Sequence, residues 1–172
     1  MTAEVSHSHL VIGQDPLSLR PSTSDDLDIL ARWFADPEVF RWWGGRPLTR
    51  DEVAAKYTGL RCPRVESHIV ELEGQPIGYI QYHLEGPGQA GLDMMLVPEF
   101  RDRGLGPKVA RLLVAHLRWD LGWTDITVDP AHDNPRAIRA WQKAGFTVEK
   151  EWPDHPDGPA LLMRLTAPAP EA

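Results

Sequence analysis

The chain has 172 residues, of which 42% are hydrophobic and 25% charged, so we expect one globular domain with a substantial core. The formal net charge of −7 disfavours a nucleic-acid partner, because neutralising phosphates requires clustered Lys and Arg, and it suits a cationic ligand better. The apolar runs are too short to span a bilayer, and no secretion signal is recognisable. We therefore expect a cytoplasmic protein without membrane association, and the single cysteine, Cys62, fits a reducing compartment.

The N-terminal part is predicted to contain a strand and three helices. We read residues 1–14 as an N-terminal extension, either frayed or forming an extra edge strand. His7 and His9 within it are too few to indicate a metal site, and we expect no metal. A strand over 17–20 ends at Pro21, and helices are predicted over about 25–35, 37–43 and 50–60, the last beginning at a Thr49 and Glu52 capping box.

The rest of the chain is predicted to contain six strands and two helices. Strands are predicted over 66–72, 77–84, 90–97, 126–128, 146–152 and 161–165, and helices over about 107–121 and 135–144. A single domain over 15–166 accommodates all of them, and we predict that the Pro- and Ala-rich residues 167–172 form a disordered tail.

A glycine turn between a strand and a helix is the most informative motif. Residues 101–106, Arg-Asp-Arg-Gly-Leu-Gly, follow the apolar run 94–97 and lead into the helix predicted after Pro107. Glycines allow close backbone approach, and a helix N-terminus attracts anions, so this arrangement is typical of phosphate binding. Nucleotide patterns do not fit, since Lys108 is not followed by Ser or Thr and Val109 stands where a dinucleotide fingerprint needs a third glycine.

The same motif resembles the acyl-CoA loop, Arg/Gln-x-x-Gly-x-Gly/Ala, of the GNAT N-acetyltransferases, which Arg101, Gly104 and Gly106 match. Residues 134–146, ending in Lys-Ala-Gly-Phe, resemble the fourth-helix signature of that family. The resemblance implies an acetyl-CoA-dependent N-acetyltransferase with an α/β fold. Its sheet would be mixed, mostly antiparallel, with six to seven strands flanked by helices and splayed between the fourth and fifth strands. It implies a small-molecule amine as substrate and a monomer or homodimer.

Within the family, most of the chain resembles the aminoglycoside 6′-N-acetyltransferase subgroup. Two elements that are not general to GNAT enzymes carry this likeness, Trp-Trp-Gly-Gly at 42–45 and Asp-Gly-Pro-Ala at 157–160. The subgroup implies that the acceptor is the 6′-amine of an aminoglycoside, as in antibiotic resistance.

The resemblance also implies which residues bind the cofactor. Backbone near Met95 and Leu96 would pair with the pantetheine arm, and the N–H groups from Asp102 to Lys108 would hold the pyrophosphate. The full set is Met95, Leu96, Arg101, Asp102, Arg103, Gly104, Leu105, Gly106, Pro107, Lys108, Asn134, Arg139 and Trp141.

Three of these residues depart from the family pattern. Pro107 lacks an N–H, and Asp102 replaces a usual glycine and adds negative charge. Trp141 stands where many relatives have a tyrosine that protonates the leaving thiolate, and indole is no practical acid.

For the acceptor, the resemblance implies a pocket of carboxylates and aromatic faces, which suits a polycation. The residues are Trp42, Trp43, Tyr57, Asp93, Asp129 and Asp157. Asp93 is the candidate general base, acting directly, through water, or by electrostatic positioning. The alternative is purely structural: Asp93 as a surface charge at a strand edge, and the other two aspartates as turn residues.

Two other functions compete with this one. One is N-acylation of another amine, such as a hydroxylysine siderophore precursor, but a catalytic His on the fourth strand would be expected and none lies between Ala90 and Val97. His83 lies on the preceding strand. The other is a non-catalytic acyl-CoA-binding protein, which Pro107 and Trp141 would favour.

Overall fold

The structure, a computed structural model, describes residues 10–166. His7, His9 and the predicted tail 167–172 lie outside the described residues. The strands are β1 (Ile12–Gln14), β2 (Leu17–Pro21), β3 (Val65–Leu72), β4 (Gln75–Gly86), β5 (Gln89–Leu96), β6 (Asp125–Val128), β7 (Phe146–Trp152) and β8 (Ala160–Leu165). The α-helices are α1 (Leu27–Phe34), α2 (Pro37–Phe40), α3 (Arg50–Tyr57), α4 (Leu105–Ala115) and α5 (Pro135–Lys143).

Short helical turns extend two of these helices. η1 (Ser24–Asp26) precedes α1 and carries a capping box between Thr23 and Asp26, so the first helix begins in a 3₁₀ turn. η2 (Pro98–Phe100) follows β5, and η3 (His116–Asp120) prolongs α4 as a π-helical stretch. α4 itself begins at Leu105, two residues before the predicted start at Pro107. Within residues 10–166, no helix has the length and apolar character needed to cross a membrane.

One mixed sheet of eight strands, in the order β1-β2-β3-β4-β5-β6-β8-β7, organises the molecule. β5 and β6 are parallel and the other neighbours are antiparallel, which confirms the predicted mixed, mostly antiparallel sheet. The strand beyond the expected six to seven is β1, which pairs with β2 at the sheet edge. Ile12 is 8% exposed and joins the core, which explains why this segment adds a strand.

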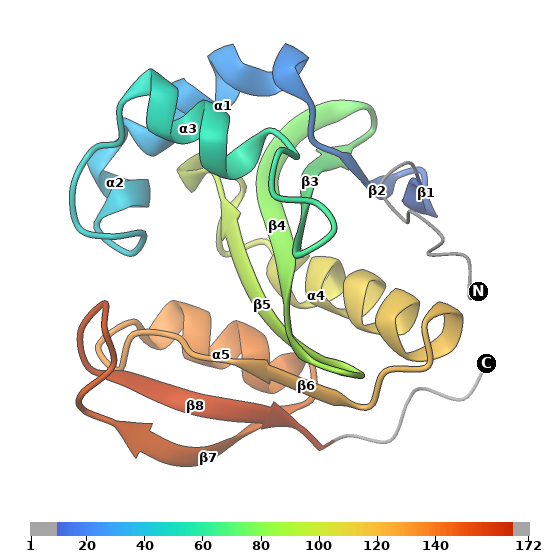
Figure 1. Ribbon diagram of the computed structural model, residues 1–172, viewed down its shortest axis with the longest axis vertical. Coiled ribbons are helices and arrows are strands. Elements are labelled where there is room, and N and C mark those ends of the chain that lie inside the picture. The colour runs from blue at the N-terminus through green and yellow to red at the C-terminus, as the bar shows by residue number, and fades with distance from the viewer. Residues whose placement is uncertain (1–9, 167–172) are drawn as a thin grey trace.

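The sheet splays between β5 and β6. Because β1 is an additional strand, these are the fourth and fifth strands of the prediction, which is confirmed. These strands pair only from Gln89 with Asp125 to Gly91 with Thr127. Beyond Gly91, β5 stays paired with β4 as far as Leu96, whereas β6 pairs with β8. Figure 1 shows the two halves of the sheet, β1–β5 and β6–β8, diverging from this point. The backbone of β5 from Leu92 onward therefore has no strand partner on its β6 side.

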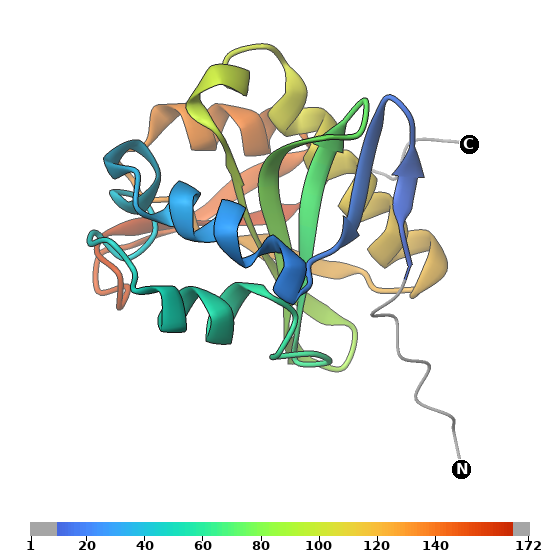
Figure 2. The same ribbon diagram turned by 90° about the horizontal axis from the view of Figure 1, so that it is seen from above.

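Helices cover both faces of the first half of the sheet (Figure 2). On one face, Leu30 and Phe34 of α1 and Val53 and Tyr57 of α3 pack with Tyr79 of β4. On the other face, α4 contributes another set of buried residues, Val109, Ala110, Leu113 and Val114, that packs against β2, β4 and β5. Each set follows helical spacing, so the apolar stripe of each helix meets the sheet. β4 and β5 are therefore packed between two hydrophobic cores.

Candidate active site

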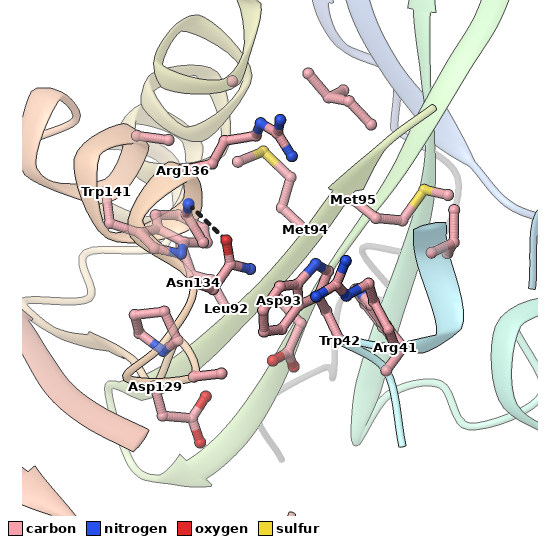
Figure 3. A pocket seen from close by; sticks show the side chains of 18 of the residues that line it. Arg41, Trp42, Leu92, Asp93, Met94, Met95, Asp129, Asn134, Arg136 and Trp141 are labelled. Carbon is pink, nitrogen blue, oxygen red and sulfur yellow. Dashed lines mark hydrogen bonds between the residues drawn. The ribbon is translucent and has the colours of Figure 1, made fainter. Parts of the chain in front are cut away.

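A cavity of about 860 Å³ opens where β5 and β6 diverge. Its volume suits a small-molecule site. In Figure 3, Arg41 and Trp42 project towards β5 from one side, and Asn134, Arg136 and Trp141 lie on the other. We call its two parts the loop end, lined by Asp102, Gly104, Gly106, Asn134, Arg136, Arg139 and Trp141, and the carboxylate end, lined by Trp42, Trp43, Tyr57, Asp93, Asp129 and Asp157.

At the loop end, backbone groups are presented to the cavity. Gly104 precedes α4 with a φ of 73°, and no side chain caps this helix N-terminus. The first-turn N–H groups therefore have neither an intrahelical nor a side-chain partner, which suits an anion. A Cβ built on Gly104 meets nothing within 4 Å, so the space beside it is open. Pro107 lies in this first turn, where an N–H would have no helical partner in any case.

Asp102 also adopts a left-handed conformation, with a φ of 59°. Asp tolerates this region better than most residues, which explains how it can replace a glycine here. Its carboxylate accepts from the Arg136 guanidinium at 3.3 and 3.4 Å. Arg136 therefore offsets part of the negative charge that Asp102 brings to the loop.

Arg101 fixes the loop to its surroundings. Its guanidinium donates to the carbonyls of Leu96 and Glu38, both at 2.9 Å. The side chain thus ties the loop to the end of β5 and to α2. It lines the cavity while two of its N–H groups are used in these bonds.

Three residues expected to bind the cofactor do not line the cavity. The Arg103 guanidinium lies over the Phe100 ring, 5.1 Å from its centroid, and Leu105 packs against the core. Lys108 lines a separate depression, together with Leu17 and Arg111. The other ten expected cofactor residues line the cavity.

α5 forms one wall of the loop end. Asn134 caps the helix, its Oδ1 accepting from the Ala137 N–H at 3.2 Å (Figure 3), so the side-chain amide N–H groups stay available. Trp141 is 5% exposed and packs edge to face with Phe146 at 5.3 Å. Arg136 and Arg139 on the same helix add positive charge, so the loop end is basic.

At the carboxylate end, Asp93 of β5 is held by a hydrogen-bond network. Gln81, its register partner on β4, donates from Nε2 to Asp93 Oδ2 at 2.9 Å. Gln81 Oε1 accepts from the Tyr79 hydroxyl at 2.8 Å and from Arg61 at 2.9 Å. Because both donors engage the amide oxygen, the amide nitrogen must face Asp93. The carboxylate is therefore oriented by buried polar groups and does not sit as a free surface charge.

Asp129, which follows β6, is joined to the β7–β8 loop. Its Oδ2 lies 2.7 Å from His155 Nε2, and His155 Nδ1 accepts from the Asp157 N–H at 3.1 Å. Burial raises the pKa of Asp129 above the ordinary aspartate value, and the nearby charge of Asp93 adds to this effect. The His155 contact opposes both. His155 thus connects the two aspartates that line this end of the cavity.

Aromatic rings form the remaining wall. Tyr57 stacks on Phe34 at 4.3 Å with an interplanar angle of 8°, and Trp43 meets Tyr57 edge on at 5.9 Å. Burial raises the pKa of Tyr57 to about 12, so its hydroxyl remains a hydrogen-bond donor at neutral pH. Trp42 carries the Arg41 guanidinium over its ring at 4.6 Å.

Comparison with known proteins identifies the family. A model of the acetyltransferase (GNAT) domain matches residues 22–153. This chain belongs to the GNAT acetyltransferase family. The chain therefore has the GNAT fold, as predicted, with the splayed sheet and with the glycine loop between β5 and α4.

Several relatives of this GNAT protein are named for aminoglycoside modification or resistance. An aminoglycoside N(6′)-acetyltransferase type 1 of Klebsiella pneumoniae is 35% identical over 181 residues, covering 95% of this chain and 89% of the relative. A kanamycin resistance protein of Rhizobium radiobacter is 42% identical over 84 residues, 48% of this chain and 77% of that protein. The structure of AAC(6′)-Ib in complex with paromomycin and acetyl-CoA superposes with a TM-score of 0.81 at 35% identity, covering 88% of this chain and 94% of that one.

Three residues that orient the carboxylates of this acetyltransferase site were not predicted from sequence. Gln81 and Arg61 orient Asp93, and His155 holds Asp129. Gln81 could have been found from the sequence, because pairing β4 with β5 through their hairpin places it opposite Asp93. The loop that carries His155 has no periodicity, and nothing in the sequence pointed to its contact.

Proposed function

We propose that this acetyltransferase transfers the acetyl group of acetyl-CoA to the 6′-amine of an aminoglycoside. The observation that carries the proposal is the convergence of three carboxylates, Asp93, Asp129 and Asp157, on one end of a cavity walled by Trp43 and Tyr57. A polycationic acceptor with several ammonium groups matches this pattern of charges and aromatic faces. The relatives named for this activity support the same acceptor.

The residues at the loop end fit acetyl-CoA. The uncapped first turn of α4 offers N–H donors for a pyrophosphate, and the open space at Gly104 admits it closely. The unpaired edge of β5 offers backbone groups to an extended amide-containing arm, and the Asn134 amide adds a donor beside it. The thioester supplies the activated acetyl group.

The carboxylate end would bind and orient the amine. Asp129 and Asp157 would neutralise ammonium groups of the acceptor, and Asp93, oriented by Gln81, would receive a proton from the reacting one. Tyr57 and Trp43 would exclude water from one side of the acceptor. Trp141 has no titratable proton to give at neutral pH, so protonation of the departing thiolate is assigned to water.

The test is release of free thiol from acetyl-CoA by the purified protein, measured with different acceptors. The panel holds kanamycin and other aminoglycosides with a 6′-amine, a matched compound with a 6′-hydroxyl, N-hydroxylysine and spermidine. We expect release only with the 6′-amino compounds, and mass spectrometry should place one acetyl group on that nitrogen. Preference for spermidine or N-hydroxylysine would overturn the aminoglycoside assignment. Binding of acetyl-CoA without release for any amine would favour a binding protein.

A further inference from the structure

His83 of β4 lies beside Asp93 although it is ten residues away on another strand. Its Nδ1 is 3.5 Å from Asp93 Oδ2, and its Nε2 is 3.2 Å from Glu85 Oε1. The strand register explains the approach: Gln81 faces Asp93 and His83 faces Gly91, so alternate residues of β4 point to the same face. The histidine ring thus bridges a cavity carboxylate and an outer one.

Gly91 makes room for this ring. A Cβ at that position would stand 2.3 Å from the Cε1 and Nε2 atoms of His83. Any other residue would therefore push the imidazole away from Asp93. Gly91 is also the last residue of β5 that pairs with β6, so the ring sits where the two strands separate.

The rest of the Asp93 environment leaves one oxygen for the substrate. Gln81 donates to Oδ2, the oxygen that also faces His83. Among the described residues, no hydrogen bond engages Oδ1. The Asp93 and His83 side chains are 33% and 34% exposed, so each has one side towards water or a ligand.

We propose that His83 and Asp93 act as a pair. Asp93 Oδ1 holds the acceptor ammonium, and the carboxylate passes the proton that the ammonium gives up from Oδ2 to Nδ1 of the neutral His83 ring, which releases its Nε2 proton to water past Glu85. This inference rests on the proposed function and names a positioning and proton-accepting residue for it. The ammonium gives up one proton before the nitrogen attacks the thioester carbonyl carbon. A C–N bond then forms, the C–S bond breaks, and the second nitrogen proton goes to the thiolate through water. One proton per turnover leaves by the pair.

The chemistry favours a pair over a lone carboxylate. A free aspartate has a pKa of about 3.9 and a free imidazole one of about 6.5, so imidazole is the better match for a proton from an alkylammonium. The contact with Asp93, assisted by Glu85, raises the pKa of His83 above that ordinary value. The charged groups that face His83 are Asp93 from β5, Glu85 from its own strand and Asp129 from the end of β6. All are acidic, and all favour a proton on the ring.

The experiment compares His83→Ala, His83→Asn and wild type with kanamycin and acetyl-CoA across pH. For His83→Ala we expect kcat near neutral pH to fall by roughly 10- to 100-fold, part of the usual effect of general base catalysis, with the KM for acetyl-CoA unchanged. The deficit should shrink towards about pH 9, where more acceptor amine is already neutral. Added imidazole should restore part of the activity, because the Ala variant leaves a ring-sized space beside Gly91.

His83→Asn separates proton transfer from hydrogen bonding. Its amide can donate to Asp93 but does not titrate, so we expect it to be as slow as the Ala variant and insensitive to imidazole. Wild-type activity in this variant would reduce His83 to a structural hydrogen bond and overturn the inference. His132→Ala is the matched control, since that histidine is exposed and does not line the cavity, and it should behave as wild type.

The outcomes distinguish the inference from the function on which it rests. If the wild-type protein acetylates no 6′-amino compound, the proposed function fails. If it does, and His83→Ala matches it at every pH, only the pairing of His83 with Asp93 is overturned. Thermal unfolding and acetyl-CoA binding of each variant, measured in parallel, check that the fold is retained.

Discussion

The glycine loop at the loop end presents backbone groups from one short segment and the first turn of α4, whereas the carboxylate end presents side chains that come from five elements or loops. At the loop end, φ angles at Asp102 and Gly104 shape the surface. At the carboxylate end, orientation depends on the contacts of Gln81 with Asp93 and of His155 with Asp129. A backbone site tolerates many side chains but few changes of φ. A site built from side chains tolerates small changes of φ but few changes of side chain. Substitutions should therefore affect the two ends in different ways.

The largest effect is expected for Gly104→Val. A β-branched residue at a φ of 73° is strained and would project into the open space beside the loop, so acetyl-CoA affinity should fall by roughly 1,000-fold or more, about 4 kcal/mol. Isothermal titration calorimetry measures this loss.

Gly74→Val is its matched control. Gly74 lies in the β3–β4 turn with a φ of 77° and open space at its Cβ position, so its strain is the same. We expect both variants to lose similar thermal stability and only Gly104→Val to lose affinity. Equal affinity in the two would remove the loop from cofactor binding.

Asp93→Asn should have the next largest effect. Removing the carboxylate that receives the proton should lower kcat by roughly 100-fold and leave the KM for acetyl-CoA within twofold. Steady-state kinetics with kanamycin measure both. Asp28→Asn, a change at an exposed residue of α1 that does not line the cavity, serves as the control. An unchanged kcat in Asp93→Asn would exclude Asp93 from catalysis.

Asp129→Asn should act on the acceptor alone. Losing one carboxylate should raise the KM for kanamycin by roughly tenfold, about 1.4 kcal/mol, with the difference shrinking as salt is added. Because burial raises the pKa of Asp129, it takes up a proton at a higher pH than an exposed aspartate does. As the pH is lowered, the wild-type KM for kanamycin should therefore begin to increase at a higher pH than an exposed aspartate would give. The variant has no carboxylate at this position, so this increase should be absent from it.

Asp154→Asn, an exposed change in the β7–β8 loop, controls for the loss of net charge. The same KM increase in both variants would show that overall charge, and not the position of Asp129, binds the acceptor.

The smallest effects are expected for cationic side chains at the loop end. Arg139→Ala should weaken acetyl-CoA binding only severalfold, since exposed ion pairs contribute about 0.2–1 kcal/mol. Lys108→Ala should leave it unchanged, because that side chain lies at a separate depression. A larger loss for Lys108→Ala than for Arg139→Ala would contradict the orientation of the first turn of α4.

The same contrast explains what the sequence allowed us to predict. The glycine loop is contiguous in sequence and its glycines mark the turn directly, so strand, loop and helix were predicted close to their observed bounds. The side chains of Arg103, Leu105 and Lys108, which do not line the cavity, could not be recognised, because a loop motif does not specify which way a side chain turns.

The carboxylate end depends on information that is not local. Asp93, Asp129 and Asp157 were named through resemblance, and the structure brings them together in one cavity. Gln81, which orients Asp93, follows from strand register, whereas Arg61 and His155 lie in loops, whose contacts alternation of residue types does not reveal. The sequence places His83 on the strand before the one that would carry a catalytic histidine, yet the pairing of β4 with β5 brings it beside Asp93.

The separation of β5 from β6 also has a mechanical consequence. The two halves of the sheet share only three residue pairs, ending at Gly91. A ligand arm lying along the free edge of β5 would serve as the missing strand and brace one half against the other. At a hundredfold excess over its dissociation constant such a ligand stabilises the fold by about 2.7 kcal/mol. The cofactor would therefore be a removable part of the architecture, and the protein should be stiffest when it is ready to react.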